Sequence, residues 1–205
     1  MSENAFLLLQ EMDLENVETQ IIMQCAPVIA GLKISNLLIV GNNNSEHVKT
    51  IMHKTGLYWK ELLNLNNQIT FLVYQPQKLK EYLEQQNVQE LMIKLGYHSC
   101  TEQVLVDNVK KKYHDYMICR KEFPHEMGLL LGYPVEDVCG FIENNGKNFL
   151  FSGYWKVYEN MPAKKKLFLK FEQARETMLE LISCGISITD VIDIYKEEPL
   201  CQAVG

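Results

Sequence analysis

Two apolar runs that flank a pair of asparagines place the strongest constraint on the fold. Residues 57–76 read LYWKELLNLNNQITFLVYQP, and Asn66 and Asn67 are residue types that tolerate the positive φ angles of a tight turn. A third short apolar run, at 34–41, ends at a glycine and is typical of a buried strand. Three strands so close in sequence predict a small sheet, either antiparallel or mixed.

Most of the remaining chain has helical spacing. Helices are predicted at 14–23, 45–56, 76–120 (three of them), 124–132, 134–146, 163–183 and 187–196. A fourth strand is predicted at 148–158, where successive side chains alternate between two faces. The pattern therefore predicts one α+β domain over residues 1–205, with about four strands flanked by helices and a loose tail at 196–205.

Charge and hydropathy exclude several classes of partner. The chain has 205 residues, a formal net charge of −6 and a pI near 5.4, which argues against a nucleic-acid-binding surface. The apolar run at 5–9 has no basic region before it, so no signal peptide is expected. No apolar run reaches the about 18 residues of a membrane helix. We expect a cytoplasmic protein that binds neither nucleic acid nor membrane.

The six cysteines lie far apart, and no Cys-x-x-Cys pair occurs. In a reducing compartment they are expected to be free thiols. A zinc ribbon or finger lacks its ligand spacing.

Two strings stand out: CAPVIAGLK at 25–33, and FPHEMGLLLGYPVEDVCGFIENNGKNFLFSGYWKVY at 123–158. Together they resemble the signatures of a bacterial family found mostly in anaerobes, the domain-of-unknown-function family 3793. The order of elements is similar over essentially the whole chain. Met127 stands where the family usually has a branched aliphatic residue, which affects packing only. The resemblance implies no established reaction, cofactor or partner.

Cys25 lies in the first string, two residues before Pro27. If Pro27 begins a helix, the thiol lies at the helix N-terminus, where the helix dipole lowers a thiol pKa and favours a nucleophile. The alternative is a small buried side chain beside a kink in a longer helix.

His125 and Glu126 are the second candidates, as an acid–base or orienting pair. The alternative is that His125 caps the helix or hydrogen-bonds locally, while Glu126 only stabilises the helix dipole. If Cys25 meets them in the fold, a thiolate–imidazolium pair could form, oriented by Glu126, Asn144 or Asp137. A metal version would use Cys25, His125 and Glu126 as ligands for iron or zinc.

Further residues could bind a ligand, an anionic one among the options. These are Lys33, Asp137, Asn144, Lys147, Tyr154 and Lys156. The alternative is that those on the 148–158 strand form its solvated face. No dinucleotide-binding, P-loop or Gly-x-Ser-x-Gly motif is found, which disfavours nucleotide-fold enzymes and serine hydrolases.

The favoured hypothesis is a small-molecule site, catalytic or not, built from Cys25, His125 and Glu126 with Lys147 and Lys156. The alternative is a binding or interaction module in which the motifs are structural. The sequence indicates no particular cofactor and no oligomeric state.

Overall fold

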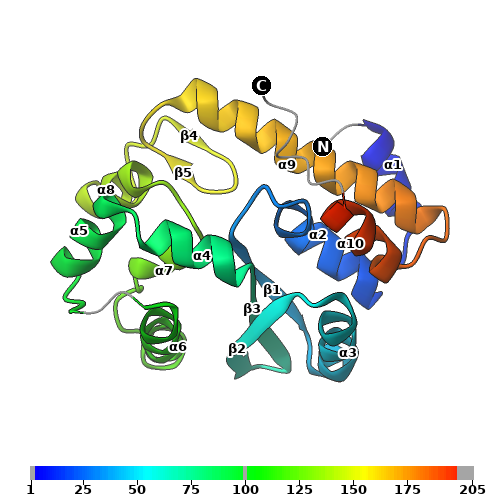
Figure 1. Cartoon of the computed structure of the whole chain (residues 1–205), viewed down its shortest axis with the longest axis horizontal. Coiled ribbons are helices and arrows are strands. Elements are labelled where there is room, and N and C mark those ends of the chain that lie inside the picture. The colour runs from blue at the N-terminus through cyan, green and yellow to red at the C-terminus, as the bar shows by residue number, and fades with distance from the viewer. Residues whose placement is uncertain (1–2, 99–100, 198–205) are drawn as a thin grey trace. The chain divides into compact units, whose positions relative to one another are not determined.

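A computed structural model of the chain describes residues 3–98 and 101–197 (Figure 1). The chain falls into two compact units. Unit 1 comprises Met1–Tyr74 and Leu169–Gly205, and unit 2 is Gln75–Phe168. The expectation of a single domain stays a prediction, since a division into compact units does not test whether each folds alone.

Unit 1 combines helices with a three-stranded sheet. Its elements are α1 (Glu3–Glu11), α2 (Val17–Ile29), β1 (Ser35–Gly41), the 3₁₀ helix η1 (Asn42–Asn44), α3 (Ser45–Thr55), β2 (Tyr58–Leu65), β3 (Gln68–Tyr74), the later part of α9 (Met161–Ser183) and α10 (Ile188–Glu197). Of the predicted tail, residues 196 and 197 belong to α10, and 198–205 lie outside the described residues.

The sheet has the order β1-β3-β2, and both pairs are antiparallel. Asn66 and Asn67 join β2 to β3 with φ angles of 52° and 60°, so the predicted tight turn is confirmed. The three predicted strands are confirmed, and the antiparallel option is the one adopted. The class is α+β.

Apolar side chains of α2 and of the sheet form the core of unit 1. Ile21, Ile22 and Cys25 of α2 are fully buried in one cluster with Leu38 of β1 and Phe71 of β3. Side chains of α3, α9 and α10 complete the cluster. Figure 1 shows α2 alongside β1, which it contacts. The apolar character of the second half of α2, from Ile21 to Ile29 apart from Gln24, is explained by this position, because a helix segment buried on most sides needs no polar face.

Unit 2 is mainly helical. Its elements are α4 (Pro76–Leu83), α5 (Gln86–Lys94), α6 (Glu102–Cys119), α7 (Glu126–Leu130), α8 (Val135–Glu143), β4 (Phe151–Ser152), β5 (Lys156–Val157) and the first turns of α9. Thr101 caps α6 as predicted, since its hydroxyl accepts a hydrogen bond from the N–H of Val104. Gly132 and Gly146 follow α7 and α8 with positive φ angles, which confirms both predicted helix ends.

The predicted fourth strand is wrong, because residues 148–158 fold back on themselves. Two short strands, β4 and β5, pair as a hairpin in which Phe151 faces Val157. Gly153 lies at the reversal, against the ring of Phe168, where a Cβ atom would come within 2.5 Å of the ring carbons. Alternating side chains do not distinguish a strand that continues from one that turns, because both keep a period of two residues.

In the two described ranges, 3–98 and 101–197, no helix has the length and apolar character needed to cross a bilayer.

The packing of Tyr158 on α8 explains why residue 140 is a glycine. A Cβ atom on Gly140 would lie 2.4 Å from Cγ of Tyr158. We expect Gly140→Ala to lower the free energy of unfolding by about 1–3 kcal/mol, measured by urea denaturation, because the side chains must move apart.

The control is Glu143→Ala at an exposed position of the same helix, which should change the free energy by less than about 0.5 kcal/mol. In a Tyr158→Ala background Gly140→Ala should cease to destabilise, since alanine is the better helix former. A Gly140→Ala protein as stable as the parent would contradict this packing.

Candidate functional site

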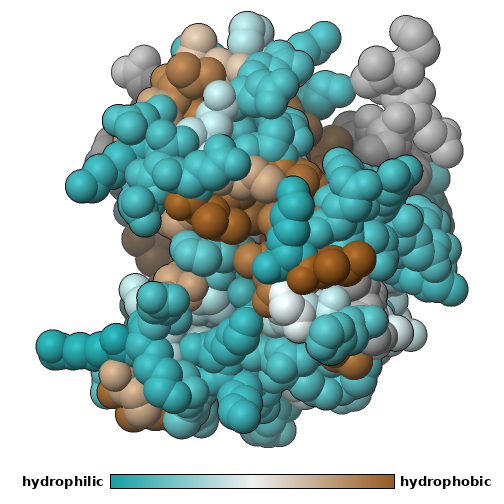
Figure 2. Space-filling model, turned by 90° about the vertical axis from the view of Figure 1, so that its left-hand side faces the viewer, coloured by the Kyte–Doolittle hydropathy of each residue, from teal (hydrophilic) through white to brown (hydrophobic). Residues whose placement is uncertain are grey.

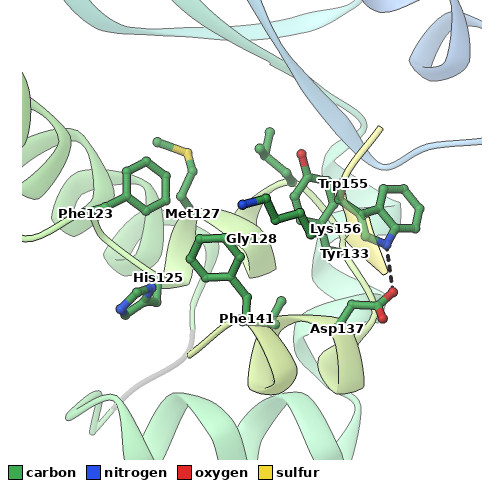
Figure 3. A pocket seen from close by; sticks show the side chains of 11 residues that line it. Phe123, His125, Met127, Gly128, Tyr133, Asp137, Phe141, Trp155 and Lys156 are labelled. Atoms are coloured by element: carbon green, nitrogen blue, oxygen red, sulfur yellow. Dashed lines mark hydrogen bonds between the residues drawn. The ribbon is translucent and has the colours of Figure 1, made fainter. Parts of the chain in front are cut away.

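A cavity of about 260 Å³ lies within unit 2. Its walls come from α7, α8, the hairpin and the residues just before α7. The apolar part of the lining includes Phe123, Met127, Leu131, Tyr133, Phe141 and Trp155. The lining also contains three polar side chains, His125, Asp137 and Lys156 (Figure 3). Tyr133 adds a hydroxyl group. The whole cavity is therefore built from the second of the two strings found in the sequence.

Close packing of α7 on α8 shapes one wall of the cavity. A Cβ atom on Gly128 of α7 would lie 3.0 Å from a methyl group of Val138 of α8. The ring of Tyr133 stacks on Trp155, with centroids 4.9 Å apart and an interplanar angle of 28°. Phe123, which precedes α7, is 37% exposed, so the part of the lining that it forms reaches the protein surface. Figure 2, which views the side where α5 and α8 lie in Figure 1, shows hydrophobic side chains gathered near its middle among hydrophilic ones.

Asp137 joins α8 to the hairpin. Its carboxylate is 2% exposed, and Oδ2 accepts a 2.7 Å hydrogen bond from Nε1 of Trp155, drawn in Figure 3. Oδ1 accepts hydrogen bonds from the backbone N–H groups of Tyr158 and Glu159, at 2.7 and 3.2 Å. Both oxygens are thus engaged by the fold. This arrangement favours a structural role for Asp137 over the predicted role as an orienter or ligand contact.

His125 stands at the start of α7 with its ring half-buried in the cavity wall. Its side chain makes no capping hydrogen bond to α7, which contradicts the alternative of a local cap. Nδ1 is buried and has no hydrogen-bond partner, and the ring lies edge-on to Phe141 at 5.9 Å. His125 also borders a second, more open hollow of about 630 Å³, together with Lys112, Arg120 and other residues. The imidazole therefore lies in the walls of both hollows.

Glu126 forms its side-chain hydrogen bonds with Tyr97 and Lys112 and not with His125. The carboxylate is 3% exposed and receives hydrogen bonds from Oη of Tyr97 and from Nζ of Lys112, both at 2.5 Å. Burial by itself raises the pKa of Glu126, but these hydrogen bonds outweigh it and leave the pKa below its ordinary value. Burial and the same carboxylate raise the pKa of Tyr97. Glu126 is thus an ion-paired anion and does not orient the imidazole by a hydrogen bond.

Lys156 contributes the cationic group of the cavity. Nζ donates a 2.7 Å hydrogen bond to the carbonyl oxygen of Gly146. It also lies over two aromatic rings, 5.6 Å from the centroid of Phe141 and 5.1 Å from that of Phe149. Of the predicted ligand contacts, Lys156 is thus one that the structure brings to the cavity.

Three other predicted contacts do not line the cavity. Asn144 follows α8 and donates a hydrogen bond to the carbonyl oxygen of Gly140. Tyr154 packs on Phe168, with ring centroids 5.4 Å apart, and Lys147 is exposed. The predicted roles of these side chains remain untested. The positions that sequence reasoning missed are the apolar walls, and their only signal was the density of aromatic residues in the string.

Of the two environments considered for Cys25, the structure shows the buried one. Pro27 lies inside α2, so no helix begins beside the thiol. Cys25 is fully buried, and burial raises the pKa of its thiol to about 12, against a smaller opposing effect of Lys33. Such a thiol stays protonated at neutral pH, which favours the packing interpretation.

Lys33 is buried beside it in unit 1. Its Nζ donates a 2.5 Å hydrogen bond to Oδ1 of Asn36. Burial lowers the pKa of Lys33 to about 8. Because Cys25 and Lys33 belong to unit 1, and His125 and Glu126 to unit 2, their convergence stays a prediction.

The described cysteines Cys25, Cys119, Cys139 and Cys184 are free thiols, and Cys100 and Cys201 lie outside the described residues. Within residues 3–98 and 101–197, no three His, Cys, Asp or Glu side chains are grouped so that they could hold a metal ion. In this part of the chain, the alternative of an iron or zinc site is therefore not supported by any group of ligands.

Thiol labelling tests the environment of Cys25. At neutral pH, Cys25 of the native protein should react with a thiol reagent at least about a hundredfold more slowly than the exposed Cys119 and Cys184. Burial keeps the reagent away from Cys25 and keeps its thiol protonated. Peptide mass spectrometry after timed quenching measures the three rates. Urea should abolish the difference. Rapid labelling of native Cys25 that is lost in His125→Ala would instead support the thiolate–imidazolium pair.

Replacing Asp137 tests its role as the tie between α8 and the hairpin. Asp137→Asn should lower the free energy of unfolding by about 2–3 kcal/mol, because an amide NH₂ group then faces buried N–H donors. The measurement is urea denaturation followed by circular dichroism and by tryptophan fluorescence.

The matched control is Glu136→Gln, which removes the neighbouring, partly exposed carboxylate paired with Lys164 at 2.7 Å. Its effect should stay below about 1 kcal/mol. Equal losses in the two variants would show that Asp137 has no special role.

The comparisons with known proteins agree with the resemblance seen in the two strings. Neither the curated proteins nor the solved structures yielded a match. The model of one family, described as "Protein of unknown function (DUF3793)", matches residues 21–192. This match covers most of the chain and includes both strings. The chain therefore belongs to the DUF3793 family of proteins of unknown function.

Proposed function

We propose that unit 2 is a small-molecule-binding module and that the 260 Å³ cavity is its site. Ligand sites are typically concave and apolar, with a few polar groups that orient the ligand. The cavity fits this description, since aromatic and aliphatic walls surround an imidazole, an ammonium group and the carboxylate of Asp137. A ligand small enough to enter would be held mainly by apolar contacts.

The observation that carries this proposal is the unpaired Nδ1 of His125. Buried polar atoms in proteins nearly always have a hydrogen-bond partner, because a missing partner costs about 1–3 kcal/mol. His125 makes no capping bond, and Glu126 is occupied by Tyr97 and Lys112. A ligand hydroxyl, amide or carboxyl group would supply the missing partner.

The position of His125 favours proton transfer as a second candidate activity of the same site. Histidine is the residue type best suited to exchange protons near neutral pH. The ring borders the apolar cavity and also the open polar hollow, so a proton taken from a ligand could pass to solvent. No Ser, Thr or Cys lies in the lining, so covalent catalysis by such a nucleophile has no support in this cavity.

Binding is tested with two small probes of similar shape, p-cresol and toluene. Both should shift the amide resonances of residues 123–156 saturably in an NMR titration, because both offer a ring to the apolar walls. His125→Ala should weaken p-cresol about five- to tenfold, the worth of one hydrogen bond, and leave toluene nearly unchanged.

The matched control is His114→Ala, at an exposed position of α6 outside the lining, which should alter neither affinity. The proposal is wrong if neither probe binds the native protein at millimolar concentration. It is also wrong if the shifts map outside 123–156.

A further inference from the structure

The ammonium group of Lys156 is paired with no anion in the part of the chain that the structure describes. Within the described ranges, no carboxylate lies within 4.0 Å of Nζ, whose contacts are the Gly146 carbonyl and the rings of Phe141 and Phe149. A lysine ammonium has three N–H donors, and Gly146 takes one of them. Two donors and a full positive charge therefore remain available at a half-buried position.

The acidic residue in the lining does not neutralise this charge. Asp137 already accepts hydrogen bonds from Trp155, Tyr158 and Glu159. Its Oδ2 also lies 3.9 Å from Nζ of Lys164, a second cation. Among the described residues, the ammonium group in the cavity lining is thus paired with no carboxylate, which suits a ligand that carries a negative charge.

The ammonium group is aimed at the cavity by the turn that ends α8. Gly146 has a φ angle of 69°, and a Cβ atom there would lie 3.0 Å from the ring of Phe141 and 3.5 Å from Nζ of Lys156. In Figure 3 the nitrogen of Lys156 is directed towards the side on which Phe123, His125 and Met127 lie. The turn therefore holds the cation against the aromatic wall of the cavity.

The volume limits the size of the ligand. An apolar cavity of about 150 Å³ holds one benzene molecule. A cavity of about 260 Å³ accommodates a ring of that size with a short side arm. The faces of Tyr133, Phe141 and Trp155 suit offset or edge-on contacts with such a ring.

We propose that the site is specific for a small aromatic carboxylate, with its ring against the apolar walls and its carboxylate on Lys156. This inference rests on the proposed binding function and names its ligand class. A single negative charge matches the single free ammonium. A phosphate dianion would bring a second negative charge into a largely apolar space in which Lys156 is the one lysine or arginine of the lining.

The test compares carboxylates with their neutral amides. Benzoate, phenylacetate and 3-phenylpropionate are titrated against benzamide, phenylacetamide and 3-phenylpropionamide at neutral pH, with toluene as the charge-free reference, and amide shifts of residues 123–156 are followed by NMR. In the native protein at least one carboxylate should bind about tenfold or more tightly than its amide, since hydrogen bonds to charged groups are the stronger ones.

Variants assign this preference to Lys156. Lys156→Met keeps the length of the side chain and should bring the carboxylate-to-amide ratio of dissociation constants to about one, with toluene binding retained as evidence of a folded site. Lys156→Arg should keep part of the preference. Lys147→Met removes an exposed lysine nearby, outside the lining, and should leave the ratio unchanged.

The outcomes separate this inference from the function on which it rests. If toluene binds but every amide binds as tightly as its carboxylate or more tightly, the proposed specificity is wrong and the binding function stands. A carboxylate preference that persists in Lys156→Met would also overturn the assignment. If neither toluene nor any other probe binds, the binding function itself is wrong. Competition by millimolar inorganic phosphate would contradict the choice of a monoanion.

Discussion

The buried carboxylate of Asp137 is the interaction on which the site in unit 2 depends. It lies in the first turn of α8 and accepts hydrogen bonds from the indole of Trp155 and from the backbone of Tyr158 and Glu159. One side chain thereby holds a helix against a hairpin of two very short strands. Such a hairpin has too few backbone hydrogen bonds to be stable alone, so the carboxylate and the aromatic packing must keep it in place.

The rest of the string at 123–158 provides either close packing or the cavity. Gly140 and Gly153 leave room for the rings of Tyr158 and Phe168, and Gly128 leaves room for Val138. These contacts bring together walls that are largely apolar. Two polar groups that the fold does not use fully, the imidazole of His125 and the ammonium of Lys156, border that space. The functional proposals rest on these two groups.

The string at 25–33 has a different explanation, which belongs to unit 1. Gly31, with a φ angle of 71°, ends α2, and the carbonyl oxygen of Pro27 accepts hydrogen bonds from the N–H groups of Leu32 and Lys33. Cys25 is fully buried in the same helix. The string thus ends a buried helix before β1 begins. A distinctive sequence pattern around a cysteine is explained here by packing and helix termination.

Much of the fold could be predicted from the sequence because it is encoded locally. The turn at Asn66 and Asn67, the cap at Thr101 and the helix ends at Gly132 and Gly146 each depend on the φ angles or hydrogen bonds of a few adjacent residues. The candidate site was predictable only in part: the sequence singled out the string that lines the cavity, with His125 and Lys156 in it. It left two environments open for Cys25 and assigned a single strand to a hairpin.

The question left open at Pro27 and the error at 148–158 both concern properties that depend on distant residues. Whether Pro27 begins a helix or lies within one is decided by burial of α2 against the sheet, and the hairpin is decided by the carboxylate of Asp137 and the ring of Phe168. The sequence by itself determined the class, the three strands of the sheet, most of the helices and the string that carries the cavity, since period and turn chemistry are local. Only the tertiary structure decided which polar groups remained without partners, because a hydrogen bond between side chains exists only when packing brings both atoms together.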